Sequence, residues 1–367
     1  MRRSGEFFTG LMLSIISIVV VAGICEALLR VALFSDNFSV PELRQSWRYA
    51  DSAYDDEYWK LAFLFNYAAR AQRVGHVDPE LGWAIKKTPD NPLGLVSETP
   101  YRIEDIGRAV LFYGDSFVAG ASPIPDRIPQ VMDRLLPEVS VLNYGVGGYG
   151  VDQIYLRYAA TVGGFKDPVV LVGILTSDLD RSILAMRTGQ KPYFDILNGQ
   201  LVRQNLPILP TTREYIDRYP PEIKSYLFRF VMFRLRSWLP EEWFDRLFDY
   251  DEKHQRKLAV NSMILQALKQ DSSERELPLG VVIFYSQEEL LEASWRVKFL
   301  KETLQDLEIP YFDTRLSISR YVKDNGMTLD GLYYPDNGHP NELGNKVIAE
   351  GVIKWLNDLG EINKSQL

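Results

Sequence analysis

The sequence predicts an α/β domain built on a parallel, doubly wound sheet, with one transmembrane helix before it. Between residues 109 and 313, short apolar runs alternate with stretches of helical pattern. Within these runs polar and apolar residues do not alternate, which is typical of strands covered on both faces. Strands separated by helices form βαβ units, whose right-handed crossovers place ligands at the carboxyl ends of the strands.

Length and composition suit a globular protein and exclude some function classes. The chain has 367 residues, of which 46% are apolar and 25% charged, and its net charge is −8. This acidic balance does not favour nucleic acid, so we expect no nucleic-acid partner. Cys25 is the only cysteine, which leaves no disulfide within one chain and no cysteine-based metal site. We expect neither a metal nor a cofactor.

The N-terminal element is predicted from residues 7–25, which carry no charged side chain. As a helix this run spans about 28 Å, close to the hydrocarbon thickness of a bilayer. Arg2 and Arg3 precede it, and after Arg30 no Lys or Arg follows until Arg44. The positive-inside rule then places the N-terminus in the cytoplasm and the rest of the chain outside.

We interpret this element as an uncleaved single-pass anchor that contacts the bilayer through residues 7–34. A cleaved signal peptide is an alternative, but no clean small-x-small site follows the run. A lipoprotein cysteine would need a small residue before Cys25, where Ile24 stands. Glu26 and Arg30 are four residues apart and are expected to pair on one helix face.

A helical stalk is predicted next, over residues 36–75, which are rich in aromatic and acidic residues. The aromatic side chains either sit at the lipid headgroups or pack on the domain behind, and both interpretations stay open. A loop-rich linker continues to Gly107. The expected domains are therefore an anchor over 1–35, a stalk and linker over 36–107, and an α/β domain over 108–360.

Five apolar runs predict the strands of the sheet, at residues 109–113, 139–142, 169–175, 279–285 and 309–313. Helices are expected at 151–162 and 288–307. An insertion at about 186–260 interrupts this rhythm, and we interpret it as a cap over the site. Its segments are a hairpin at 193–204 with a turn at Asn198-Gly199, and helices at 225–238 and 241–250. The helix at 225–238 is expected to lie against either a membrane surface or the main domain.

The first motif that carries chemistry is Gly114-Asp115-Ser116-Phe117, directly after the first strand. A serine at this point sits on a sharp strand-to-helix turn with its hydroxyl exposed at the edge of the sheet. The free N–H groups and the positive dipole end of the following helix favour an oxyanion. The second motif, Asn143-x-Gly145-x-x-Gly148, follows the second strand, where glycines allow a tight turn and a close backbone N–H.

The third motif is Asp336-x-x-His339-Pro340, just ahead of an amphipathic helix in whose first turn Pro340 is expected. A tight turn can aim both side chains of Asp336 and His339 the same way. The carboxylate then fixes the imidazole tautomer while the other ring nitrogen takes a serine proton. Of the remaining histidines, His76 and His254 are expected on the surface.

Together, the three motifs in this order resemble blocks I, II and V of the SGNH (GDSL-like) hydrolases, over residues 108–357. The resemblance implies a flavodoxin-like three-layer α/β/α sandwich with a five-stranded parallel sheet, acting as a carboxylic ester hydrolase. It implies Ser116 as the nucleophile, His339 as general base and then acid, and Asp336 as the residue that orients the imidazole.

The same resemblance implies an oxyanion hole built from the N–H groups of Ser116 and Gly148, with Asp115, Asn143 and Asp178 in supporting roles. Block III of the family reads Gly-x-Asn-Asp, and its asparagine amide donates into this hole. Here Ser177 takes the place of that asparagine, before Asp178. Either the Ser177 hydroxyl serves instead, or another group does, or the site is weakened.

We therefore expect an extracytoplasmic serine esterase that hydrolyses small acyl esters through an acyl-enzyme. The order of anchor, stalk with Asp78-Pro-Glu-Leu-Gly-Trp83, and capped domain is similar to membrane-tethered bacterial members of the family. Several of these add or remove O-acetyl groups on surface polysaccharides, which suggests a glycan substrate. An O-acyltransferase with the same triad and a non-catalytic glycan-binding or scaffold module are the alternatives. A nucleotide-binding protein is disfavoured, because neither GxGxxG nor a P-loop follows the first strand.

Overall fold

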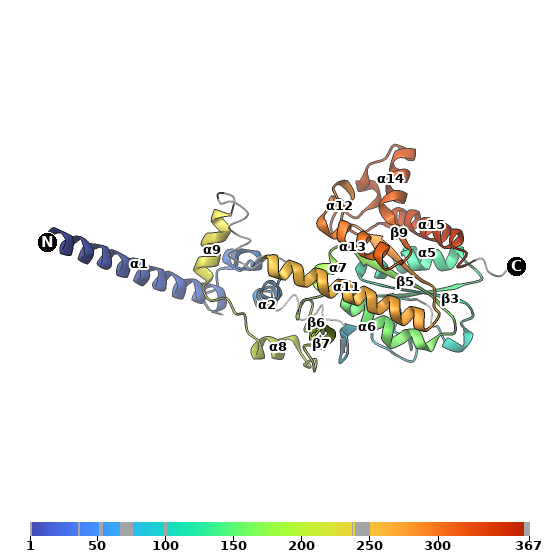
Figure 1. Ribbon diagram of the computed structural model, residues 1–367, viewed down its shortest axis with the longest axis horizontal. Coiled ribbons are helices and arrows are strands. Elements are labelled where there is room, and N and C mark those ends of the chain that lie inside the picture. Colours follow the sequence, from blue (N-terminus) through green and yellow to red (C-terminus); the bar gives the residue numbers. More distant parts are fainter. Residues whose placement is uncertain are drawn as a thin grey trace. The chain divides into compact units, whose positions relative to one another are not determined.

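A computed structural model describes residues 2–35, 37–50, 54–66, 76–98, 101–236, 238 and 250–362 (Figure 1). The chain divides into two compact units. We name them the N-terminal unit, residues 1–74, 186–188 and 210–251, and the sheet unit, residues 75–185, 189–209 and 252–367. Each is described separately.

The sheet unit is built on five parallel strands in the order β4-β3-β5-β8-β9. The strands are β3 (Ala109–Gly114), β4 (Ser140–Gly145), β5 (Val169–Leu175), β8 (Leu279–Phe284) and β9 (Tyr311–Asp313). Counted along the chain, their spatial order is 2-1-3-4-5, the flavodoxin-like arrangement. The predicted fold class is confirmed, and each predicted apolar run forms one of these strands.

Helices cover both faces of this sheet. One face carries α5 (Ile128–Leu135), α14 (Thr314–Asn325) and α15 (Glu342–Asp358), and α15 contacts both of the others. The other carries α6 (Val151–Thr161) and α11 (Tyr250–Glu274), joined by a 2.7 Å hydrogen bond from Tyr158 to Asp271. The strands read as continuous apolar runs because both faces are covered: every residue of β3 and β5 is buried.

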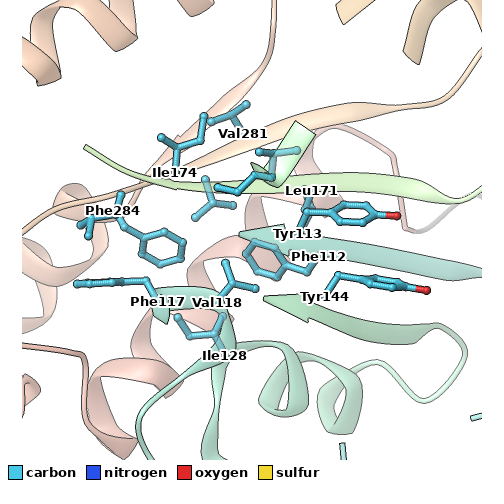
Figure 2. Packing of buried hydrophobic residues seen from close by; sticks show 14 of the residues in the cluster. Phe112, Tyr113, Phe117, Val118, Ile128, Tyr144, Leu171, Ile174, Val281 and Phe284 are labelled. Atoms are coloured by element: carbon cyan, nitrogen blue, oxygen red, sulfur yellow. The ribbon is translucent and has the colours of Figure 1, made fainter. Parts of the chain in front are cut away.

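The core lies between the sheet and these helices, and part of it supports the end of β3 (Figure 2). Phe112, Val118 and Phe284 are buried there with less than 2% exposure each. Short helices follow three of the strands: α4 (Ser116–Ala119) after β3, α7 (Asp178–Arg181) after β5 and α12 (Gln287–Leu291) after β8. They begin at the carboxyl edge of the sheet, so residues of separate strand ends meet there.

Two helix boundaries differ from prediction. The segment expected as one helix at 288–307 forms α12 and α13 (Trp295–Asp306), because Ser294 caps α13 by accepting from the Arg296 N–H at 3.2 Å. Pro340 lies outside α15 instead of in its first turn. Asn341 is the N-cap and accepts from the Gly344 N–H at 3.0 Å, while Pro340 pairs with Tyr333 in an isolated β-bridge.

The insertion at 186–260 is divided between the units. Its hairpin, β6 (Tyr193–Leu197) and β7 (Gln200–Gln204), turns at Asn198 and Gly199 with φ of 54° and 75°, and belongs to the sheet unit. Residues 210–251 belong to the N-terminal unit. The stretch at 76–107, expected as linker, lies in the sheet unit with β1 (His76–Asp78) and β2 (Gly82–Ala84). Its apolar side chains Trp83 and Leu95 are buried in the core, which explains the difference.

The N-terminal unit contains α1 (Arg2–Phe34), α2 (Asp56–Phe65), α8 (Thr212–Arg218) and α9 (Tyr226–Leu235). Within α1, Gly10–Phe34 has a mean hydropathy of 2.5 and is long and apolar enough to cross a membrane. In the predicted stalk, the described residues form α2 and two 3₁₀ turns, η1 (Pro41–Leu43) and η2 (Ser46–Arg48). Residues 67–75 of the stalk and 241–249 of the second insertion helix lie outside the described residues.

Candidate active site

Ser116 stands where β3 passes into α4, at the carboxyl edge of the sheet. The side chain of Asp115 caps α4 by accepting from the Phe117 N–H at 2.8 Å. A Cβ on Gly114 would lie 2.3 Å from the Val118 side chain, so only glycine lets the helix pack this closely on the strand. The turn predicted from the sequence around Ser116 is therefore fixed by its neighbours on both sides.

His339 reaches Ser116 from a loop at the far end of the sequence. Its Nε2 lies 2.8 Å from the Ser116 Oγ, and its half-buried ring packs on the ring of Phe117 with a centroid distance of 4.8 Å. The loop is closed behind the imidazole: the Tyr334 N–H donates to the His339 carbonyl at 2.8 Å. The structure thus brings together the predicted nucleophile and base.

Asn337 determines which nitrogen of His339 carries the proton. The His339 backbone N–H donates to the Asn337 side chain at 3.0 Å, so the atom facing it must be the amide oxygen. That oxygen lies 3.1 Å from Nδ1, and the Asn337 carbonyl oxygen lies 3.0 Å from it. Since both oxygens only accept, Nδ1 is the protonated nitrogen and Nε2 is free to accept the Ser116 hydroxyl proton.

Asp336 is not brought to the imidazole. It is exposed at the tip of the loop, and within the described residues no hydrogen bond or ion pair links its carboxylate to His339. The resemblance had implied this residue as the one that orients the ring. In this geometry, Asn337 occupies both acceptor positions at Nδ1, and the sequence analysis did not single it out.

Burial lowers the pKa of His339 below its ordinary value. The nearby carboxylate of Asp115 and the hydrogen bond to Asn337 act in the opposite direction, and the positive charge of Arg181 lowers the pKa further. The net direction favours a neutral imidazole, the form that accepts a proton.

Gly147 lies beside the serine, and Gly148 is the next residue of the same loop. A Cβ on Gly147 would lie 3.8 Å from the Ser116 Cβ, and Gly148 has φ of 87°, a conformation that favours glycine. Within the described residues the N–H groups of Ser116 and Gly148 donate to no protein group. Their role as oxyanion donors, which the resemblance implies, stays a prediction.

Asn143 secures this loop without touching the reacting atoms. Its buried side chain accepts from the Gly145 N–H at 3.0 Å and donates to the Val118 carbonyl at 3.1 Å. A Cβ on Gly145 would lie 2.2 Å from the Ala119 nitrogen, so α4 packs directly on the end of β4. Asn143 therefore ties the nucleophile's helix to the neighbouring strand.

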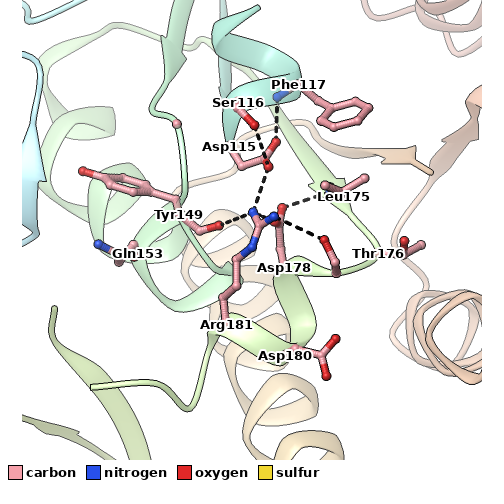
Figure 3. A network of polar contacts seen from close by, with 12 residues as sticks. Asp115, Ser116, Phe117, Tyr149, Gln153, Leu175, Thr176, Asp178, Asp180 and Arg181 are labelled. Atoms are coloured by element: carbon pink, nitrogen blue, oxygen red, sulfur yellow. Dashed lines mark hydrogen bonds and ion pairs between the residues drawn. The ribbon is translucent and has the colours of Figure 1, made fainter. Parts of the chain in front are cut away.

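A buried guanidinium joins the remaining predicted residues (Figure 3). The Arg181 Nη1 lies 2.9 Å from a carboxylate oxygen of Asp115, pairs with Asp178, and donates to the Tyr149 carbonyl at 3.0 Å. Its Nη2 donates to the Ser177 Oγ at 3.2 Å. The other Asp178 oxygen accepts from the Leu175 N–H at 3.0 Å and holds the turn after β5.

Sequence analysis missed Arg181, although its spacing of three residues from Asp178 on a short helix was a signal for an ion pair. Ser177 is half-buried, and its hydroxyl accepts from Arg181, which leaves its own hydrogen free to donate elsewhere. In the described chain, no cluster of three or more His, Cys, Asp or Glu is arranged to hold a metal ion. His76 is exposed, whereas His254 packs edge-on against Trp295 at 4.5 Å.

No known protein-family model and no curated protein matches the chain. Solved structures are similar to it at low identity. A member of the lipolytic G-D-S-L family from Veillonella parvula has 12% identity and a TM-score of 0.37, over 68% of this chain and 99% of that one. A catalytic mutant of an acetylxylan esterase from Geobacillus stearothermophilus has 14% identity and a TM-score of 0.37, over 70% of this chain and 95% of that one.

Proposed function

We propose that the chain is a serine esterase of the SGNH type, which cleaves small acyl esters through a covalent acyl-enzyme. One observation carries the proposal: the 2.8 Å contact between the Ser116 Oγ and the His339 Nε2 at the carboxyl edge of the sheet. The protonated Nδ1 supports it, because this tautomer leaves Nε2 as the acceptor.

In the first step, the Ser116 Oγ attacks the acyl carbon while His339 Nε2 takes the hydroxyl proton. The negative charge that develops on the carbonyl oxygen faces the N–H groups of Ser116 and Gly148 and the Ser177 hydroxyl. The C–O bond to the alcohol then breaks, and Nε2 returns the proton to the leaving oxygen. In the second step, water gives a proton to Nε2 and attacks the acyl carbon. The bond from this carbon to the Ser116 Oγ then breaks, Nε2 returns the proton to Oγ, and the acid is released.

We extend the proposal to an extracytoplasmic enzyme whose anchor is retained, with O-acetyl groups of a surface glycan as the substrate. The retained anchor is supported by contacts directly after the charge-free run: the Glu26 carboxylate accepts from the N–H groups of Tyr226 at 3.1 Å and Leu227 at 2.8 Å. A cut beyond Glu26 would remove these contacts, and Leu33 further along α1 is fully buried in the same unit.

Labelling with a fluorophosphonate, which phosphonylates an activated serine, tests the enzyme class on the full-length detergent-solubilised protein. We expect labelling of the wild type and hydrolysis of a simple acetyl ester. The matched control is Ser116→Ala, which should do neither while keeping its melting temperature. An unlabelled, folded wild type would instead establish a non-catalytic module.

A further inference from the structure

Helix α9 is apolar on two faces, and the N-terminal unit covers only one of them. On the covered face, Phe230 stacks on Tyr49 at a centroid distance of 6.3 Å, and Phe233 meets Trp47 edge-on at 4.9 Å. Tyr226, at the start of the helix, is 3% exposed. These contacts fix which side of α9 faces its own unit.

The opposite side carries a stripe of large apolar side chains, which we name the α9 stripe: Phe228, Val231, Leu235 and Trp238. Their exposed fractions are 48%, 42%, 41% and 83%. Spacings of three, four and three residues place them along one side of the helix and its C-terminal turn. Among the described residues nothing covers this stripe, and the exposed Arg234 and Arg236 flank it.

Contacts with α1 fix the position along α1 at which α9 begins. Every described side chain of α1 up to Cys25 is exposed, and the first to be covered is Glu26. The Glu26 carboxylate accepts from the N–H groups of Tyr226 at 3.1 Å and Leu227 at 2.8 Å. An anion at this helix terminus is favoured by the dipole.

Arg30, one turn further along α1, donates to the carbonyl of Lys224 at 3.1 Å and pairs with Glu26 at 2.7 Å. The start of α9 is therefore held at the point where the charge-free run of α1 ends. In Figure 1, α9 crosses the end of α1 instead of running alongside it. With α1 along the bilayer normal, α9 would lie along the membrane surface.

We propose that α9 is an interfacial helix that docks on an anionic lipid surface. The α9 stripe enters the boundary between headgroups and acyl chains, where tryptophan and phenylalanine are favoured, and Arg234 and Arg236 reach anionic headgroups. A lipid surface fits better than a protein partner, because the stripe starts at the level where α1 leaves the hydrocarbon. This inference rests on the retained anchor of the proposed function.

Site-directed spin labelling of the full chain in phosphatidylcholine–phosphatidylglycerol vesicles tests it. Cys25→Ser removes the single cysteine, and labels are placed singly at Val231→Cys and Leu235→Cys. Two references complete the set: Ile18→Cys in α1, where the native side chain is 68% exposed, and Lys298→Cys in the sheet unit, at 77%. The measured quantity is the ratio of nitroxide collisions with oxygen, which partitions into lipid, to those with a water-soluble nickel chelate.

We expect this ratio at positions 231 and 235 to exceed that at 298 several-fold and to approach that at 18, and to fall when phosphatidylglycerol is omitted. A water-like ratio at 231 and 235 with a lipid-like ratio at 18 would overturn the inference and leave the anchor intact. Protection from both reagents would also overturn it, since protein would then cover the stripe. A water-like ratio at 18 would overturn the anchor itself.

Discussion

The Nε2 of His339 lies 2.8 Å from the Oγ of Ser116, although 223 positions separate the two residues in the chain. The parallel sheet makes this contact possible: Ser116 follows β3, an interior strand of the sheet, and the loop of His339 precedes α15, which packs with α5. The contact is short enough for proton transfer.

Because the two residues act as a unit, their mutational losses should not add. Ser116→Ala and His339→Ala should each lower kcat by about 10⁴-fold or more, and the double variant should be scarcely worse than either. Steady-state rates on one acetyl ester measure this, with the melting temperature as the control for folding. If the fold-loss in kcat of the double variant equalled the product of the two single fold-losses, the residues would work independently and the proposed pair would be refuted.

Substitutions at Asp336 and Asn337 test which of the two residues orients the imidazole of His339. In a serine protease, replacing the orienting aspartate by asparagine costs about 10⁴-fold in kcat. The exposed carboxylate of Asp336 makes no bond to His339 here, so Asp336→Asn should cost less than about tenfold. Asn337→Asp, which keeps an oxygen toward Nδ1, should retain more activity than Asn337→Leu, which removes the side-chain acceptor.

The Asn337 backbone carbonyl lies 3.0 Å from Nδ1 and is present in every side-chain variant. It should limit the loss in Asn337→Leu to a partial one. A loss for Asp336→Asn as large as that for His339→Ala would restore Asp336 as the orienting residue, and the loop would then have to rearrange when substrate binds.

The sheet was predictable from sequence because its strands are covered on both faces and therefore read as uninterrupted apolar runs. Ser116 and Gly148 were predictable because each follows such a run within a glycine-containing motif. The role of Asn337 was not, since it depends on how the loop from Tyr334 to His339 folds back through the hydrogen bond between these two residues. The role of Arg181 was not predictable either, because its guanidinium contacts Asp115, which lies 66 positions earlier in the chain. Only the folded sheet brings the ends of β3 and β5 together.

The profile of kcat/KM against pH should fall on its acid side with a midpoint below the ordinary histidine pKa of about 6.5. Burial lowers the pKa of His339, so the neutral base persists to a lower pH than in an exposed histidine. This acid limb reports the free enzyme, because it is read from kcat/KM. Asp115→Asn removes a charge that raises this pKa, so it should move the limb to still lower pH; a shift upward would contradict the assignment.

The same shift affects stability with a definite sign. The unfolded chain binds the His339 proton at about pH 6.5, whereas the folded site binds it only at lower pH. The stability that His339 contributes is therefore fully present above about pH 6.5. It is lost as the pH falls from there through the lower pKa of the folded site. Comparing the pH dependence of urea unfolding for wild type and His339→Gln isolates the contribution.

The N-terminal anchor predicts that the sheet unit lies outside the cytoplasm. A reporter that is active only outside the cytoplasm, fused after Leu367, should be active, and the protein should stay with membranes after a carbonate wash. A matched variant with Arg2 and Arg3 changed to glutamate should lose part of this orientation. Recovery of a shortened soluble form would establish cleavage and contradict a retained α1.

Ser177 stands where the resembled family has its oxyanion asparagine. In the proposed mechanism, its hydroxyl donates to the substrate only once charge develops on the carbonyl oxygen. Ser177→Ala should therefore lower kcat by about 10²-fold with little change in KM. Ser177→Asn, whose amide reaches farther, should hold or raise kcat where the pocket has room.

Arg181 should act through Ser177, as a positioning residue. Arg181→Lys keeps the buried charge beside Asp115 and Asp178 but loses the planar fork that reaches the Ser177 Oγ at 3.2 Å. It should lower kcat and leave KM nearly unchanged, and adding it to Ser177→Ala should cost little more. A purely structural role would instead lower the melting temperature with kcat of the folded fraction unchanged. If Ser177→Ala matches wild type, Ser177 lies outside the oxyanion hole, and the N–H groups of Ser116 and Gly148 must stabilise the oxyanion without it.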